Sequence, residues 1–178
     1  MSNFIILNNQ VVEGLEICSI FDSEKYDIFK GVTFSIDQKF AEKYLSNFKE
    51  TTVVVGIQDS DVQERGLSLE QKQIKQLVDN TKVLSSGLPI KMFENFSRSI
   101  QDRILEDSYQ LRIPLSKTIH TKMYLLKNSE TGDTRLIIGS ANLSNQAFSN
   151  TTPQLELLEI RDNSELFSEY ENYFDTEI

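Results

Sequence analysis

The stretch that decides the fold is residues 119–143, which read IHTKMYLLKNSETGDTRLIIGSANL. Two runs rich in large and β-branched apolar residues, 119–126 and 134–139, flank a polar segment, 128–133, that contains Gly132. This pattern predicts a β-hairpin whose loop is the polar segment. If the hairpin is symmetric about its loop, the end of the second strand returns beside the start of the first, within a residue or two of register.

Polar side chains are expected to meet at the open end of this hairpin. On an extended segment, residues i and i+2 share a face about 6.5–7 Å apart, so His120 and Lys122 can reach one phosphate-sized anion together. The hairpin register brings His120 near Ala141 and Asn142. A basic nucleophile, a cation and a loop with hydroxyl and amide donors at Ser140 and Asn142 predict a phosphate site.

Each group has a role in phosphodiester hydrolysis. The anionic phosphate repels a nucleophile until its charge is neutralised. Lys122 can neutralise it, while the Ser140 hydroxyl and the Asn142 amide supply hydrogen bonds. Gly139 lets the backbone approach the ligand closely. A neutral imidazole at His120 can attack phosphorus and hold the phosphoryl group until water releases it. No metal or other cofactor is required, and the sequence offers no convincing metal cage.

Each motif is weak by itself. An isolated H-x-K is common by chance, and a G-S-x-N loop is often only a turn followed by a helix cap, here at Asn142 or Ser144. Their connection by a hairpin of suitable length makes the pair far more specific.

The rest of the chain predicts a mixed sheet with helices on its faces. Further strands are expected at 26–35, 51–57, 88–93, 111–114 and 155–160. Helices are expected after capping boxes at 35–38 and 68–71, over 96–105, and from about 162 toward the C-terminus. Strand–helix alternation followed by consecutive strands and a helix is typical of an α/β (α+β) fold with a mixed β-sheet flanked by helices.

The composition is that of one globular domain. The 178 residues are 39% apolar, which is enough for a single core, so residues 1–178 are expected to form one domain. No stretch approaches the roughly 20 apolar residues of a membrane helix, and the N-terminus lacks the features of a secretory signal. The one cysteine, Cys18, cannot form an internal disulfide and is expected to be a semi-buried residue, which favours a cytoplasmic location.

The net charge of −9 argues against a surface built to coat nucleic acid. The distribution is uneven, since residues 112–135 contain five bases and two acids, whereas 156–178 contain eight acids and one base. A polyanion could therefore bind at a locally positive cleft, although the net negative charge of the rest of the molecule would repel it. The alternative for the acidic segment is an ordinary solvated helix.

The H-x-K at His120 and Lys122 and the G-S-A-N at 139–142 together resemble the signature of the phospholipase D superfamily. The motif resemblance extends from His120 to Glu156, and the strand order is compatible with it over most of the chain. In that family the histidine is the nucleophile, and the lysine and asparagine bind phosphate, which the resemblance transfers to His120, Lys122 and Asn142. It also implies that Glu156 steadies the histidine; the alternative is an exposed strand residue.

The resemblance includes one departure and one consequence. The family has an aspartate five residues after the lysine, where this chain has Lys127; that aspartate is thought to support the fold more than the reaction. Many members use two histidines, one on each side of phosphorus, as nucleophile and acid. Because His120 is the only histidine of the chain, a second copy is expected to complete the site, most simply in a two-fold homodimer.

The resemblance thus implies a metal-independent phosphodiesterase. Small members with a single motif are mostly nucleases, often joined to helicase or DNA-recognition domains in restriction and phage-defence systems. DNA is therefore the expected substrate, and the chain is compatible with the N-terminal part of a longer protein. Two alternatives stay open. One is a catalytically weak nucleic-acid-binding or dimerisation module, which the net charge and Lys127 favour. The other is a phospholipid phosphodiesterase or phosphatidyltransferase, although anionic membranes would repel the acidic C-terminal segment.

Overall fold

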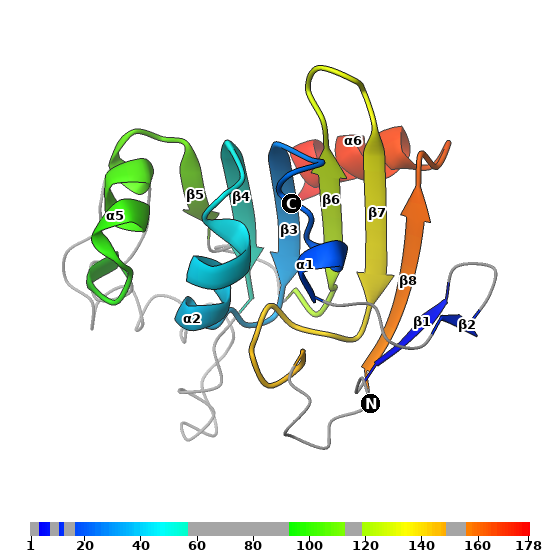
Figure 1. Ribbon diagram of the computed structural model, residues 1–178, viewed down its shortest axis with the longest axis horizontal. Helices are drawn as coiled ribbons and strands as arrows, with labels where there is room; N and C mark the ends of the chain where they lie inside the picture. The colour runs from blue at the N-terminus through cyan, green and yellow to red at the C-terminus, as the bar shows by residue number, and fades with distance from the viewer. Residues whose placement is uncertain (1–3, 8–10, 13–16, 57–92, 113–118, 149–155) are drawn as a thin grey trace.

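The computed structural model describes residues 4–7, 11–12, 17–56, 93–112, 119–148 and 156–178 (Figure 1). The strands are β1 (Phe4–Leu7), β2 (Val11–Val12), β3 (Ile28–Thr33), β4 (Glu50–Val55), β5 (Tyr109–Arg112), β6 (Met123–Lys127), β7 (Thr134–Gly139) and β8 (Glu156–Asp162). The helices are α1 (Ile17–Ile20), α2 (Gln38–Phe40), the π-helical turn η1 (Ala41–Leu45), α5 (Arg98–Leu105) and α6 (Phe167–Glu177).

The described strands form one mixed sheet in the order β2-β1-β8-β7-β6-β3-β4-β5. Strands β3, β4 and β5 are parallel, whereas β6 is antiparallel to β3, β7 to β6, and β8 to β7. As a result, the C-terminal ends of β3 and β7 lie beside the N-terminal ends of β6 and β8. We call this the motif end of the sheet, because the H-x-K precedes β6 and the G-S-A-N begins at the last residue of β7.

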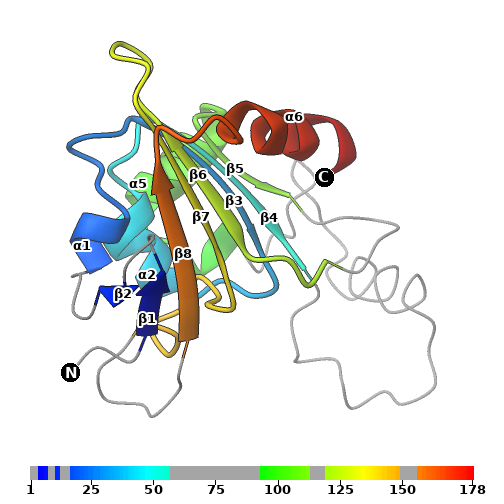
Figure 2. The ribbon, with the colours of Figure 1, turned by 90° about the vertical axis from the view of Figure 1, so that its right-hand side faces the viewer.

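Helices cover both faces of the sheet. Figure 2 shows α1, α2 and α5 on one face and α6 on the other. Because successive strand residues point to opposite faces, β6 contributes Tyr124 and Leu126 to one buried cluster and Met123 and Leu125 to the other. A strand covered on both faces reads as a continuous apolar run, which explains the unbroken burial of residues 123–126.

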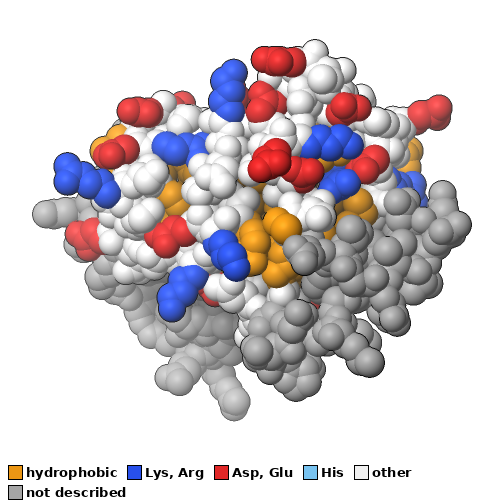
Figure 3. Space-filling view, viewed as in Figure 1, with side chains coloured by type: hydrophobic (Ala, Val, Ile, Leu, Met, Phe, Trp, Pro, Cys, Tyr) orange, Lys and Arg blue, Asp and Glu red, His pale blue; other side chains and the backbone are white. Residues whose placement is uncertain are grey.

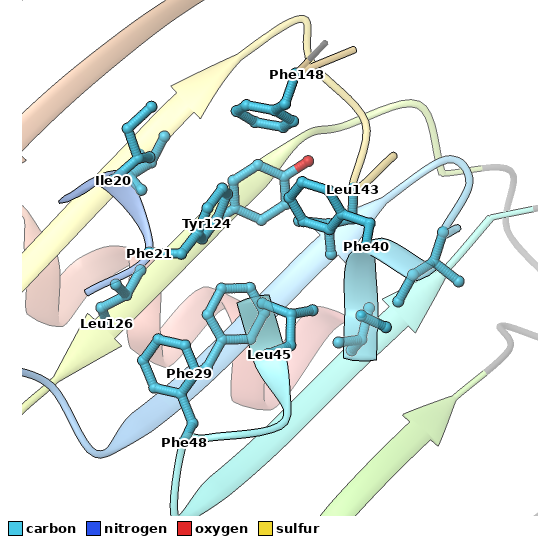
Figure 4. Close-up of a cluster of buried hydrophobic side chains, with 14 of the residues drawn as sticks. Ile20, Phe21, Phe29, Phe40, Leu45, Phe48, Tyr124, Leu126, Leu143 and Phe148 are labelled. Atoms are coloured by element: carbon cyan, nitrogen blue, oxygen red, sulfur yellow. The ribbon is translucent and has the colours of Figure 1, made fainter. Parts of the chain in front are cut away.

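Aromatic rings fill the core between the sheet and the helices α1 and α2 (Figure 4). Phe21 lies at its centre and meets Phe29, Phe40, Tyr124 and Phe148 edge-on, with ring centroids 5.4–6.0 Å apart. Edge-to-face pairs of this kind add about 0.5–1.5 kcal/mol each to the stabilisation from burial. The abundance of phenylalanine in the sequence is thus accounted for largely by this layer.

The predicted fold class, a mixed α/β sheet flanked by helices, is confirmed. The predicted hairpin is also present, as β6 and β7 pair from Met123 opposite Ile138 to Lys127 opposite Thr134. Gly132 in its loop has φ 77°, a left-handed conformation that glycine adopts at no steric cost. The strands expected at 26–35, 51–57, 111–114 and 155–160 correspond to β3, β4, β5 and β8, and the helices expected at 96–105 and near the C-terminus to α5 and α6.

The first predicted helix begins later than expected. Ile36 bridges to Leu143, and the Asp37 N–H donates to the Leu143 carbonyl over 2.8 Å, so these tertiary contacts keep 35–36 extended. Asp37, and not Ser35, caps the helix by accepting a hydrogen bond from the Lys39 N–H over 2.8 Å.

Other differences concern the start of β6 and the N-terminal elements. The strand predicted from 119 begins at Met123, so the H-x-K lies in the irregular segment before it. Strands β1 and β2 and helix α1 were not predicted; β1 pairs with β8, a partner at the far end of the chain. The helix expected from 68 and the strand expected at 88–93 fall on residues outside the described part, apart from residue 93.

Acidic and basic side chains are intermixed on the face of the molecule seen in Figure 3. That face therefore has no uniform charge of either sign. In the part of the chain that the structure describes, we find no helix with the length and apolar character needed to cross a membrane.

Candidate active site

The motif end is organised around the residues that end β3. Thr33 is fully buried, and its hydroxyl donates to the Ser35 carbonyl over 2.8 Å and accepts from the Leu143 N–H over 3.2 Å. The Phe34 N–H donates to Asn142 Oδ1 over 3.2 Å, and Thr33 Oγ1 lies 3.3 Å from the same oxygen. The end of β3 therefore holds the G-S-A-N loop in position.

His120 and Lys122 meet the aromatic ring of Phe34. The imidazole stacks on this ring, with centroids 4.6 Å apart and an angle of 25° between the planes. The Lys122 ammonium lies 5.8 Å from the centre of the ring and donates to the His120 carbonyl over 2.9 Å. Because His120 is exposed and Lys122 half-buried, both side chains are accessible at the motif end.

The hairpin joins the two motifs directly. The Gly139 N–H donates to the Lys122 carbonyl over 3.2 Å, so the hydrogen bonding of β6 with β7 continues one residue beyond the last assigned pair. The hydroxyl of Tyr124, in β6, donates to the Ala141 carbonyl over 2.5 Å. Burial raises the pKa of Tyr124 well above its usual range, so this hydroxyl stays a neutral donor at physiological pH.

Glu156, the first residue of β8, is 4% exposed, so it is not the exposed strand residue of the alternative interpretation. Its carboxylate accepts a short hydrogen bond from the Ser140 hydroxyl, and that hydroxyl accepts from the Leu157 N–H over 3.0 Å. No hydrogen bond between Glu156 and His120 is found among the described residues. Glu156 therefore braces the G-S-A-N loop through Ser140, and the Ser140 hydroxyl hydrogen points to this carboxylate.

The orientation of Asn142 leaves a donor at the site. Both of its contacts, from the Phe34 N–H and from the Thr33 hydroxyl, are made to Oδ1. The Nδ2 amide has no hydrogen-bond acceptor among the described residues. This N–H donor and the Lys122 ammonium are the kind of groups that stabilise a phosphate oxygen. Within the described ranges, no group of three or more His, Cys, Asp or Glu could hold a metal ion.

Sequence reasoning did not single out Thr33, Phe34, Tyr124 or Gly56. Gly56 follows β4, and a Cβ there would lie 2.7 Å from the Ile119 carbonyl oxygen and 3.0 Å from the Phe34 ring. Because Gly56 has no side chain, the segment after β4, the end of β3 at Phe34 and the segment at Ile119 can lie close together beside the site. These four residues belong to no recognisable sequence motif. They could have been predicted as site residues only if the pairing of β6 with β3 had been known.

Lys127 lies at the end of β6 that is remote from the site, about 17 Å along the strand from Lys122 at 3.4 Å per residue. Its ammonium is 3.3 Å from a carboxylate oxygen of Glu171 in α6. Lys30 makes further ion pairs with the same helix, at 3.2 Å to Glu171 and 2.8 Å to Asp175. The residue that departs from the family pattern thus helps to hold α6 on the sheet.

Lys127→Ala is expected to lower the free energy of unfolding by only about 0.3–1 kcal/mol, because the ion pair is partly exposed. Lys127→Asp, which introduces the family's residue, should cost more, since it brings a second carboxylate next to Glu171. Urea denaturation of both variants measures the difference. Equal stability of the two would contradict a pairing of Lys127 with α6.

Comparison with known families agrees with this geometry. The family model described as "Cardiolipin synthase, PLD-like domain" matches residues 14–178. The chain therefore belongs to this family of phospholipase D-like domains, and its general class of function is of the phosphodiesterase type. No curated protein matches the chain.

Proposed function

We propose that this chain is a metal-independent phosphodiesterase that hydrolyses DNA. The observation that carries the proposal is the convergence of three groups at Phe34, namely the His120 imidazole, the Lys122 ammonium and the Asn142 amide. In this proposal His120 is the nucleophile, Lys122 and Asn142 bind the phosphate, and Glu156 acts through Ser140 by bracing the loop. The domain spans residues 1–178.

The reaction proceeds in two displacements. Lys122 and the Asn142 Nδ2 amide neutralise and orient the phosphate oxygens. The neutral imidazole of His120 attacks phosphorus, the bond to the leaving oxygen breaks, and that oxygen takes a proton from an acid on the opposite side. The acid, now deprotonated, then acts as a base and removes a proton from water. The resulting hydroxide attacks phosphorus and breaks its bond to His120. The products are an alcohol, a phosphate monoester and the regenerated imidazole.

The opposing acid must come from outside this chain if it is a histidine, because the sequence has one. We propose a two-fold homodimer that brings two His120 side chains across one phosphate. Light scattering combined with size-exclusion chromatography measures the oligomeric state. A strictly monomeric protein with full activity would overturn this part of the proposal.

DNA is favoured by two observations. The segment from Arg112 to Arg135 is basic within an acidic chain. Lys127 and Arg135 are ion-paired at the far end of the hairpin, so among the described bases of this segment it is Lys122 and Arg112, toward the motif end, that suit attraction of a polyanion to the site. Small phospholipase D-like domains with one motif, which this chain resembles, are mostly nucleases, and we expect a fused or associated helicase or DNA-recognition domain. DNA as substrate and the presence of a single cysteine in the sequence support a cytoplasmic location. Cys18 itself is exposed and not semi-buried as predicted from the sequence.

A second candidate is phosphatidyl transfer or phospholipid hydrolysis, because the matching family is named after cardiolipin synthase. The same two-step chemistry would then act on a lipid phosphodiester. Glu171 and Asp175 of α6 are ion-paired with Lys30 and Lys127, but Glu169 and Glu177 keep this helix net acidic, which disfavours approach to an anionic membrane. A third candidate, a module that binds nucleic acid without cleaving it, would use the same donors.

The deciding experiment presents the purified chain with single-stranded DNA, double-stranded DNA and phosphatidylglycerol vesicles, all in excess EDTA. We expect DNA to be cut, and a His120→Asn preparation purified in parallel reports any contaminating nuclease. Release of lipid head groups with DNA left intact would instead favour the lipid enzyme. DNA binding without turnover would favour the binding module, and cutting that requires Mg²⁺ would contradict the metal-independent mechanism.

Asn142→Asp distinguishes the role of the Asn142 acceptor oxygen from that of its Nδ2 donor. The aspartate keeps an oxygen acceptor for the Phe34 N–H, but it replaces the amide donor by an anionic oxygen. We therefore expect little loss of stability and roughly a 10²-fold fall in kcat/KM. Asn47→Asp, an exposed site before β4 at the opposite end of the sheet, makes the same change in charge and should leave kcat/KM unchanged. Equal effects of the two would contradict a phosphate-binding role for Asn142.

A further inference from the structure

One aromatic residue contacts three groups of the proposed site. The ring of Phe34 stacks on the His120 imidazole at a centroid distance of 4.6 Å. The same ring lies 5.8 Å from the Lys122 ammonium, and the backbone N–H of Phe34 binds Asn142 Oδ1. Phe34 is thus the point at which the two motifs meet.

The Phe34 ring is itself held by its surroundings. Gly56 lies so close that a Cβ on it would be 3.0 Å from the ring and 3.2 Å from the Phe34 Cα. The Gly56 N–H donates to the Thr33 carbonyl over 2.8 Å, which ties the end of β4 to the end of β3. The ring is therefore supported by backbone, and backbone yields less readily than a flexible side chain.

Within the part of the chain that the structure describes, the imidazole has few other restraints. His120 is exposed and lies before β6, in a segment without regular secondary structure. Among the described residues, no hydrogen bond from the imidazole nitrogens is found, and the Glu156 carboxylate is bound to Ser140. An exposed side chain on an irregular segment would otherwise distribute over several staggered rotamers. The stacking contact with Phe34 favours the rotamer observed.

We propose that Phe34 is a positioning residue for the nucleophile. Its ring confines the His120 imidazole, and its backbone N–H fixes the amide that binds phosphate, so that nucleophile and phosphate are held in register. This inference rests on the proposed function, in which His120 attacks phosphorus. Attack requires reacting atoms about 3–3.5 Å apart, and small displacements reduce the rate severely.

The first test is spectroscopic and needs no substrate. Because His120 is the only histidine of the chain, its imidazole proton resonances are identified without ambiguity. A stacked phenyl ring shields these protons, so in the wild type we expect resonances upfield of free histidine and nuclear Overhauser contacts to the Phe34 ring. Phe34→Leu should move the resonances downfield. Phe48→Leu, in the core near the start of β4, should lower stability without moving them.

The second test is kinetic. Phe34→Leu should lower kcat by about tenfold or more with little change in KM, whereas Phe34→Tyr, which keeps an aromatic ring, should restore most of the turnover. If Phe34 contributed only to stability, Phe34→Tyr would not raise kcat selectively over Phe34→Leu. Phe48→Leu measures how far a loss of stability by itself lowers kcat.

Several results would overturn the inference. These are wild-type resonances at the position of free histidine without contacts to Phe34, resonances unmoved in Phe34→Leu, or resonances moved while kcat is unchanged. If the wild type hydrolyses no phosphodiester, the proposed function fails. The imidazole resonances then still decide whether Phe34 holds His120.

Discussion

Replacing His120 by asparagine is expected to reduce phosphodiester hydrolysis by at least about 10⁴-fold, because covalent catalysis loses its nucleophile entirely. The side chain is exposed, so the free energy of unfolding should change by no more than about 0.5 kcal/mol. Single-turnover cleavage of a labelled oligonucleotide in EDTA measures the rate. Acid-sensitive attachment of the labelled fragment to the wild type through its phosphoryl group, absent from the variant, would identify the intermediate.

Thr121→Ala provides the matched control, since Thr121 is the exposed neighbour of His120 in the same irregular segment. Its activity should stay close to that of the wild type. A His120→Asn variant within tenfold of wild-type activity would exclude the imidazole as nucleophile. If two copies share one site, an excess of the variant should also suppress wild-type activity after subunit exchange, whereas a monomeric enzyme would be unaffected.

The second large effect is expected at Gly139, the last residue of β7. A Cβ at this position would lie 2.0 Å from the Leu157 carbonyl oxygen and 2.9 Å from the Leu158 side chain in β8. Gly139→Ala should therefore force β7 and β8 apart, at a cost of about 2–3 kcal/mol in unfolding free energy. For a chain of this size that corresponds to a fall in Tm of about 5–10 °C, measured by circular dichroism.

The same substitution should also impair catalysis, because Gly139 leads into Ser140 and Asn142. Because the loop would be displaced in the folded protein, the rate of hydrolysis should fall by more than the fraction of protein that is unfolded. Gly132→Ala is the control within the same hairpin: no atom lies within 4 Å of its added Cβ, but its φ of 77° is left-handed. That variant should lose only about 1–2 kcal/mol and keep its activity. Equal losses in both variants would contradict the close approach of β7 to β8.

Local patterns in the sequence were sufficient for much of the fold. The β6–β7 hairpin follows from two apolar runs around a polar loop with Gly132, and this pattern acts over neighbouring residues only. The helices α5 and α6 follow in the same way from apolar periodicity. The H-x-K and G-S-A-N motifs are joined by that hairpin, so their proximity is also a local consequence. Strand β6 nevertheless begins four residues later than its apolar run.

Contacts between distant segments account for what was missed. The cap at Asp37 and the extended conformation of 35–36 depend on Leu143. Strand β1 forms only against β8, and Lys127 acquires its role from Glu171 in α6. None of these partners lies within the span of a turn or a helix, so no local periodicity indicates them.

By itself, the sequence of this protein determined the hairpin, the fold class and the chemical groups available for phosphodiester hydrolysis, because these depend on residue type and on neighbours along the chain. Only the tertiary structure decided that β3 pairs with β6 and so brings Phe34 to His120, Lys122 and Asn142. It also decided that Glu156 is buried against Ser140. Strand pairing between remote segments is set by packing of the whole core, and the geometry of the site depends on that packing.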